Sequence, residues 1–133
     1  MSLKLAKNNA PAYDYYSEGD GTDPISASGI ITGLGGTVDT TTVYMYLVAT
    51  SKRYTGIVLA VANEQAGIDW KLSLDDVTYA DTRAPADINA LGGDQVISVY
   101  AKAVLTNDGS GNQPATGVYV TPDITITALE VPV

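Results

Sequence analysis

The chain has no cysteine, no histidine and no phenylalanine. Without cysteine and histidine it has no disulfide scaffold, no thiolate metal site, no cysteine nucleophile and no histidine-dependent catalytic triad or zinc site. Basic residues are also scarce, because 7 Lys and Arg stand against 15 Asp and Glu, which gives a formal net charge of −8. Nucleic-acid binding usually shows a basic surface, so we expect no nucleic-acid partner.

Long apolar runs are missing as well. The longest aliphatic run, Ile57 to Ala62, is far shorter than the roughly 20 residues of a membrane-spanning helix. Near the start, Asn8 to Pro11 falls where an export signal would need an apolar stretch. We therefore expect no membrane partner.

The residues that are present favour a folded β-protein of one domain. Ile, Leu and Val make up 24% of the chain, above the level of roughly 20% below which a highly charged chain is disordered. Thr, Val, Ile, Tyr and Trp together supply about a third of the residues, and these side chains suit a pleated, half-buried surface. Only 17% of the residues are charged, so much of the surface is neutral or pressed against partners.

From residue 25 onward, short runs of strand-forming residues are separated by turn signals. The predicted strands are Ile25–Thr32, Thr41–Thr50, Gly56–Asn63, Ile68–Leu74, Val77–Ala80, Gln95–Thr106 and Val118–Val131, the last broken near Pro122. Residues 84–91 form one helical turn at most. This pattern predicts an all-β fold, either a sandwich or a barrel, with residues 25–133 as the folded domain.

Residues 1–24 are predicted to be an extended N-terminal arm. The stretch Asn8 to Pro24 has no period of 2 or 3.6 and carries four acids with no base. Alone in water such a segment is mobile. However, Tyr13, Tyr15 and Tyr16 fall within four residues, and tyrosine is a favoured interface residue. Two interpretations stay open, a disordered lead-in and an arm that docks on its own domain or on a neighbour.

Two predicted strands are apolar on both faces. Most strands alternate, and this alternation places Trp70 in the core. In contrast, Val43 to Val48 and Ile57 to Ala62 carry apolar side chains on both sides. A two-layer sandwich covers only one face of each sheet. The second face must therefore be covered by the arm, by a loop or by another subunit.

Two clusters of oxygen-bearing side chains are candidate calcium sites. They are Glu18, Asp20 and Asp23 in the arm, and Asp108, Ser110 and Asn112 in the loop of residues 107–117. Neither spacing matches the twelve-residue calcium-binding loop. A solvated arm and a solvated loop are the better accounts, so we expect no metal and no cofactor.

No catalytic motif is evident. Asp75 and Asp76 form an adjacent pair of carboxylates, but they lie between Leu74 and Val77, where a hairpin turn belongs. The glycine runs at 33–36 and 92–93 precede no predicted helix and so lack a phosphate cradle. No serine is flanked by a recognisable nucleophile motif. We expect no enzymatic activity.

Exposed aromatic side chains leave glycan binding open as an alternative. Strand alternation places Tyr44, Tyr46 and Tyr100 on outward faces, where small β-sandwiches often bind sugars. Exposed tyrosines are at least as often contacts between proteins. A glycan-binding module for host attachment is therefore the hypothesis from a different functional class.

Two stretches of the chain carry a pattern met elsewhere. Ile68 to Ala80 is a Trp-bearing strand that runs into Ser73-x-Asp75-Asp76-x-x-Tyr79, and Val99 to Val104 reads Val-Tyr-Ala-Lys-Ala-Val. Together they resemble small immunoglobulin-like domains of tailed-bacteriophage virion proteins. Asp76 stands where those domains usually have Gly.

The resemblance covers roughly residues 68–106 and implies an immunoglobulin-like β-sandwich of about seven strands with a structural, non-enzymatic role in a virion. Similar proteins serve as capsid decoration proteins, neck or tail accessory proteins and baseplate components. We expect a decoration (cement) subunit on the capsid exterior, with a neck or tail protein as the alternative. Its partners would be the major capsid protein, other virion proteins or sister copies in a homo-oligomer. The predicted contact residues, on the arm and one sheet face, are Tyr13, Tyr15, Tyr16, Tyr44 and Tyr46.

Overall fold

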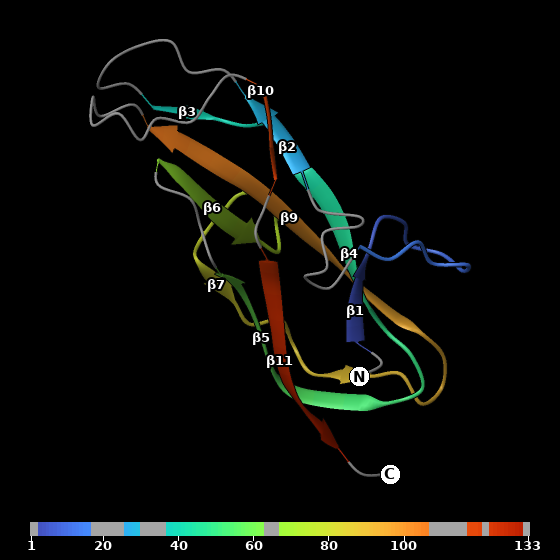
Figure 1. Ribbon diagram of the computed structural model, residues 1–133. Helices are drawn as coiled ribbons and strands as arrows, with labels where there is room; N and C mark the ends of the chain where they lie inside the picture. The colour runs from blue at the N-terminus through green and yellow to red at the C-terminus, as the bar shows by residue number, and fades with distance from the viewer. Residues whose placement is uncertain are drawn as a thin grey trace.

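Eleven strands, and no helix, make up the part of the chain that the computed structural model describes, which is residues 3–16, 26–29, 37–62, 67–106, 117–120 and 123–131 (Figure 1). The strands are β1 (Leu3–Ala6), β2 (Ser26–Gly29), β3 (Thr37–Asp39), β4 (Val43–Ala49), β5 (Arg53–Ala62), β6 (Ile68–Ser73), β7 (Thr82–Arg83), β8 (Ile88–Asn89), β9 (Gln95–Thr106), β10 (Gly117–Val120) and β11 (Asp123–Val131). All strand pairs are antiparallel. The predicted all-β class is therefore confirmed.

The larger sheet has five strands and is organised around β9. One edge of β9 pairs with β4 and then with β3, while the other edge pairs with β6. Ala101, for example, lies opposite Val43 of β4 and Leu72 of β6. β1 pairs with the far edge of β4. The long strand β9 thus holds together segments from residue 37 to residue 73.

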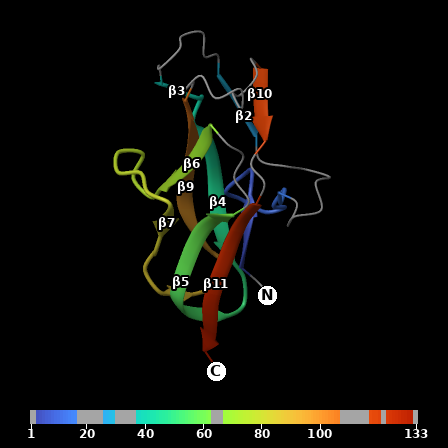
Figure 2. The ribbon, with the colours of Figure 1, turned by 60° about the vertical axis from the view of Figure 1, so that its left-hand side comes forward.

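The second sheet has four strands and is organised around β5. β11 pairs along one edge of β5, and the short strands β7 and β8 pair along the other. β2 and β10 form a separate two-stranded ladder. Figure 2 shows β5 and β11 in front of β4 and β9, as two layers of one molecule.

One hydrophobic core lies between the two sheets. The largest fully buried side chains include Trp70 of β6, Met45 of β4, and Tyr54 and Leu59 of β5. Trp70 is only 1% exposed, and its register partner on β9 is Ala103, whose small side chain leaves room for the indole. The core position predicted for Trp70 is therefore confirmed.

The chain crosses repeatedly from one sheet to the other. β4, β6 and β9 belong to the five-stranded sheet, whereas β5, β7, β8 and β11 belong to the four-stranded sheet. No β-hairpin joins β4 to β5, β5 to β6 or β8 to β9. This strand order differs from that of the immunoglobulin constant domain, in which strands ABED form one sheet and CFG the other.

The predicted strands Gln95–Thr106 and Ile68–Leu74 match β9 and β6 to within one residue. Of the short strand predicted at Val77–Ala80, Ala80 makes a single bridge to Leu72. β1, β3, β7 and β8 were not predicted. β8 falls within residues 84–91, where the sequence predicts no more than one helical turn, so the structure has a short strand in its place. Residues 30–36 and 107–116, including the loop tip, lie outside the described residues.

A β-bulge at Gly56 lets β5 bury both Tyr54 and Ile57. The register with β11 shifts here, since Thr127 lies opposite Val58 but Leu129 lies opposite Thr55. The extra residue lies on β5, where Gly56 has a φ of +60°. This is the left-handed region, which glycine adopts without strain. Strict alternation would send either Tyr54 or Ile57 to the outside, so the bulge keeps both in the core.

We predict that Gly56→Ala destabilises the protein by about 1–2 kcal/mol, because alanine resists the left-handed conformation. A Cβ at Gly56 would meet no atom within 4 Å, so backbone strain is the only cost. Gly92 is the matched control: it is equally open but has no positive φ. Gly92→Ala should be neutral or stabilise by up to about 1 kcal/mol. Urea denaturation measures both values, and equal effects of the two substitutions would contradict the prediction.

Candidate functional site

Tyrosines gather on the outward face of the five-stranded sheet. Antiparallel register sets them in rows: Tyr44 of β4 lies opposite Tyr100 of β9, and Tyr46 lies opposite Ser98 on one side and Ala6 of β1 on the other. Because side chains alternate along a strand, these residues all point away from the core that Met45 and Leu47 enter. We call this surface the tyrosine face, and its members are Tyr44, Tyr46, Tyr79 and Tyr100, with Tyr13 and Tyr15 at its edge.

Tyr44 is the most open member of the tyrosine face, with 58% of its surface exposed. Its ring meets the ring of Tyr100 edge to face, with the centroids 5.5 Å apart and the planes at 82°. This geometry is the favourable one for an aromatic pair and holds the exposed ring in place. A fixed, exposed aromatic ring is well suited to contact a partner, because little side-chain entropy remains to be lost.

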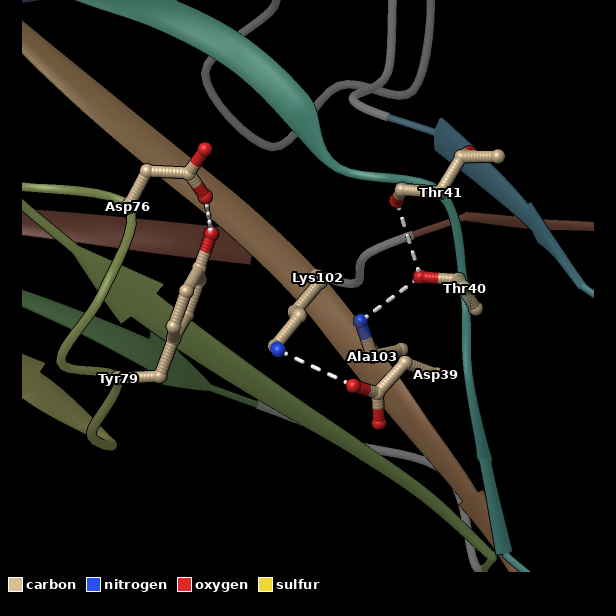
Figure 3. Close-up of polar contacts among 7 residues, drawn as sticks. All are labelled: Asp39, Thr40, Thr41, Asp76, Tyr79, Lys102 and Ala103. Carbon is tan, nitrogen blue, oxygen red and sulfur yellow. Dashed lines mark hydrogen bonds and ion pairs between the residues drawn. The ribbon is translucent and has the colours of Figure 1, made fainter.

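Tyr79 borders this pair and is anchored by polar contacts (Figure 3). Its hydroxyl donates a short hydrogen bond to Asp76, and the Lys102 ammonium lies 4.4 Å from its ring centroid. Burial, together with the Asp76 carboxylate, raises the pKa of Tyr79 to about 12. Lys102 also bonds Asp39 at 3.0 Å. The loop that carries Tyr79 is thereby tied to β9 and to β3.

The two lysines that face each other across β6 and β9 are each matched by acids. Lys71 lies opposite Lys102 in the register. Lys71 contacts Asp81 at 2.5 Å and Asp69 at 3.1 Å, and these carboxylates raise its pKa. Lys102 contacts Asp39. Each of these neighbouring lysines is therefore paired with an acid, which offsets the repulsion between their two positive charges.

Thr40 joins β3 to β4 without leaving a gap in the ladder (Figure 3). The Ala103 amide of β9 donates to the Thr40 hydroxyl at 2.9 Å, and that hydroxyl donates to the Thr41 carbonyl at 3.1 Å. The Thr40 amide in turn donates to the Ala103 carbonyl. A buried side chain thus takes the place of a backbone acceptor where the strand is interrupted.

The described part of the predicted arm folds back on its own domain. Leu3 to Ala6 is strand β1, and the chain then reverses around Asn8, whose side chain accepts from the Asp14 amide at 2.7 Å and donates to the Ala12 carbonyl at 2.9 Å. The returning segment pairs with β1 through a bridge between Ala6 and Tyr15. Residues 17–24 of the predicted arm lie outside the described residues.

The three arm tyrosines take different positions. Tyr15 continues the outward row beside Ala6, with Lys4 5.5 Å from its ring centroid. Tyr13 lies 6.0 Å from Tyr15, and desolvation, with the nearby Asp94 carboxylate, raises the pKa of its phenol. Tyr16 is partly buried and packs against the core cluster, so it belongs to the inner side of the sheet.

The folded-back arm lies at one end of the second, outward apolar face of β4. Val48 points outward yet is only 1% exposed, and it lies between Lys4 of β1 and Val96 of β9. Tyr13 reaches Asp94, two residues before Val96, so the arm tyrosines lie at this end of the face. The arm end is therefore covered, whereas the Tyr44 end is open. On β5, Val58 remains 37% exposed.

Among the predicted contact residues, Tyr13, Tyr15, Tyr44 and Tyr46 thus lie on or beside one face, and Tyr16 lies apart from it. Tyr100, which the sequence indicates only as a candidate for glycan binding, lies on the same face. Tyr79 was missed, because it lies in a loop where no strand period assigns a face. The sequence feature that could have indicated its role is its spacing of three residues from Asp76, which lets the two side chains meet across the turn.

The Asp75-Asp76 pair forms a structural turn. The Asp75 carboxylate accepts from the amides of Thr78 (2.8 Å) and Val77 (2.9 Å), and the Ser73 hydroxyl accepts from the amides of Asp75 and Asp76. Asp76 has φ +59°, a conformation that favours glycine, which is the residue usual at this position in the resembling domains. These backbone hydrogen bonds lower the pKa of Asp75 to about 2.

Among the residues that the structure describes, no three acidic side chains come together as metal ligands. The two clusters considered for calcium, in the arm and in the loop of residues 107–117, lie outside the described residues. In the same described ranges no helix is long and apolar enough to span a membrane.

We predict that Asp75→Asn flattens the loss of stability in acid. The folded-state pKa of Asp75 lies below its ordinary 3.8, so its contribution is fully present above that value and is lost as the pH falls through about 2. Between about pH 5 and pH 2, the free energy of unfolding should therefore fall less in Asp75→Asn than in the parent protein. Urea denaturation followed by Trp70 fluorescence measures this difference.

Asp87→Asn is the control for that experiment, because Asp87 is exposed and lies outside the turn. It should keep the acid dependence of the parent protein. An unchanged acid dependence in Asp75→Asn would contradict the prediction.

Comparisons with known proteins add no relative: no family model, no curated protein and no solved structure matches the chain.

Proposed function

We propose that this chain is a non-enzymatic structural protein of a tailed-bacteriophage virion, most specifically a decoration subunit that binds the capsid exterior. Its partner would be the major capsid protein, and the contact would be made by the tyrosine face. A neck or tail position uses the same surface and the same chemistry. The observation that carries the proposal is the edge-to-face pair of Tyr44 and Tyr100, with Tyr44 largely exposed, on the outward face of the five-stranded sheet.

The composition of the tyrosine face supports binding to a protein. Tyrosine is enriched at the energetically dominant centres of interfaces, where a rigid ring buries apolar area and its hydroxyl keeps a polar partner. The cations near the pair, Lys71 and Lys102, are each engaged by acids of the same chain. The free aromatic surface at Tyr44 is therefore the group that is left to contact a partner.

The position of the two resembling stretches also supports the proposal. Ile68 to Ser73 and Val99 to Val104 lie on β6 and β9, which are direct neighbours. The turn after β6 holds Asp76 in the conformation that a glycine would adopt at that point. The two stretches thus form one continuous part of the sheet, as expected if the chain shares the architecture of the domains that they resemble.

The immunoglobulin-like class belongs to the same proposal, as an architecture. Two antiparallel sheets enclose a core that contains Trp70, as in sandwiches of that class. The strand order described above departs from ABED and CFG, so the likeness that we propose concerns the two-layer sandwich. Many sandwich domains share the architecture without the same topology.

Binding to capsid shells tests the function. We predict that the full chain co-sediments with capsid shells of the phage that encodes it, and that Tyr44→Ala combined with Tyr100→Ala weakens this binding by about tenfold or more, as expected for a pair of central aromatic contacts. Val58→Ala is the control, because Val58 is exposed on the other sheet and lies away from its open edge. Its affinity should equal that of the parent protein.

Three outcomes would contradict the proposal. They are no binding to any shell, binding that the double variant leaves unchanged, and binding that the control reduces equally. Urea denaturation of each variant separates lost contacts from lost folding. Recognition of a glycan on an array, abolished by Tyr44→Ala, would favour the glycan-binding alternative.

A further inference from the structure

The chain covers or shortens most of the sheet edges that the structure describes. The outer edge of β1 is covered by the returning arm, where the Tyr16 amide donates to the Leu5 carbonyl at 3.0 Å. The outer edge of β6 is covered near its C-terminal end, where Ala80 exchanges two backbone hydrogen bonds of 2.8 and 2.9 Å with Leu72. β7 and β8 have two residues each. Such devices prevent unwanted pairing between sheets.

β11 is the longest strand that has only one partner strand among the described residues. It pairs with β5 from Asp123 to Val131, and no described residue pairs with its other edge. Figure 2 shows it as the outermost strand of its sheet. A strand of nine residues with one free edge presents a row of backbone amides and carbonyls that can accept another strand.

The central part of β11 is also free of protecting residues. Ile124 to Leu129 contains no charge, no proline and no glycine, and its isoleucines and threonines favour strand structure. The bulge of the β5–β11 pair places its extra residue on β5, so β11 itself stays regular. A regular, neutral edge is the kind that pairs with a further strand.

The side chains along this edge are incompletely covered. Ile124, Ile126 and Ala128 are partly buried and pack against the core, whereas Leu129 is 68% exposed. A further strand beside β11 would extend both rows of side chains and cover the parts that remain open.

We propose that the occupant of this edge is β11 of a second copy, paired antiparallel across a two-fold axis. The charge of the protein favours this choice: copies with a net charge of −8 repel one another, and the neutral edge lets them approach where no charge is opposed. An axis at Thr127 places Ile126 opposite Ala128 of the second copy. It also places the terminal acids Asp123 and Glu130 opposite Val131 and Ile124, so no acid faces an acid.

The dimer surface is separate from the tyrosine face, which lies on the other sheet. Dimer formation and shell binding can therefore fail independently, and the experiments distinguish the two. A two-fold dimer would present two tyrosine faces, so its binding to a lattice would gain from bivalency where the spacing matches.

Sedimentation of the full chain tests the dimer. The parent protein should sediment as a dimer that dissociates on dilution, and Thr127→Lys should raise the dissociation constant about tenfold or more, since the two lysines would meet at the axis. Val58→Lys is the matched control, because Val58 is the register partner of Thr127, one strand away from the edge. It adds the same charge to the same face and should leave the dissociation constant near that of the parent protein.

A disulfide trap tests the same edge without adding charge. The chain has no cysteine, so Thr127→Cys introduces one thiol. Directly opposed residues bring their Cβ atoms to about 4.5–5.5 Å, close to the reach of a disulfide. With oxidised glutathione as the oxidant, two thiols lose their protons and two electrons to form one S–S bond. Covalent dimers should form in Thr127→Cys much faster than in Val58→Cys.

Either of two results would overturn the proposal. One is a monomer at every concentration reached, with equal oxidation of the two cysteine variants. The other is a dimer that Val58→Lys disrupts and Thr127→Lys does not, which would indicate association through the sheet face. Circular dichroism of each variant confirms folding before the comparison.

Discussion

The pairing of β9 on both of its edges is the constraint on which the rest of the structure depends. Its inward side chains Val99, Ala101 and Leu105 are fully buried, and its outward side chains include Tyr100 and Lys102. Because one strand supplies both rows, the parity that builds the core also builds the tyrosine face. A shift of β9 by one residue would exchange the two sides and remove both.

The sequence predicts well those parts in which one strand carries its own pattern. β6 and β9 alternate strictly, so their limits and the burial of Trp70 follow from period 2 alone. β1 and β3 have four and three residues, too few to show a period, and pairing with β4 and β9 decides their structure. The Gly56 bulge and the Thr40 hydroxyl bond likewise depend on partners that are distant in the sequence.

The two strands that are apolar on both faces have different surroundings. The outward side of β4 is covered at Val48 and open at Tyr44, so its apolar character serves partly to hold the arm. The outward side of β5 carries Val58 and Ala60 beside Thr127 and Thr125 of β11, and none of these four residues is charged. The low charged fraction of the chain thus reflects two distinct surfaces on opposite sheets.

The repeated crossing between sheets has a consequence for how the chain reaches its fold. Neither sheet is continuous in the sequence, so no early hairpin can contain a finished part of the core. β3 must wait for β9, more than sixty residues away, and β5 must wait for β11, at a similar separation. Contacts of this kind give a high contact order and slow folding, on the order of milliseconds to seconds. The two layers therefore acquire their structure together, and β11, which follows the other described strands in sequence order, completes the sheet that its outer edge could extend.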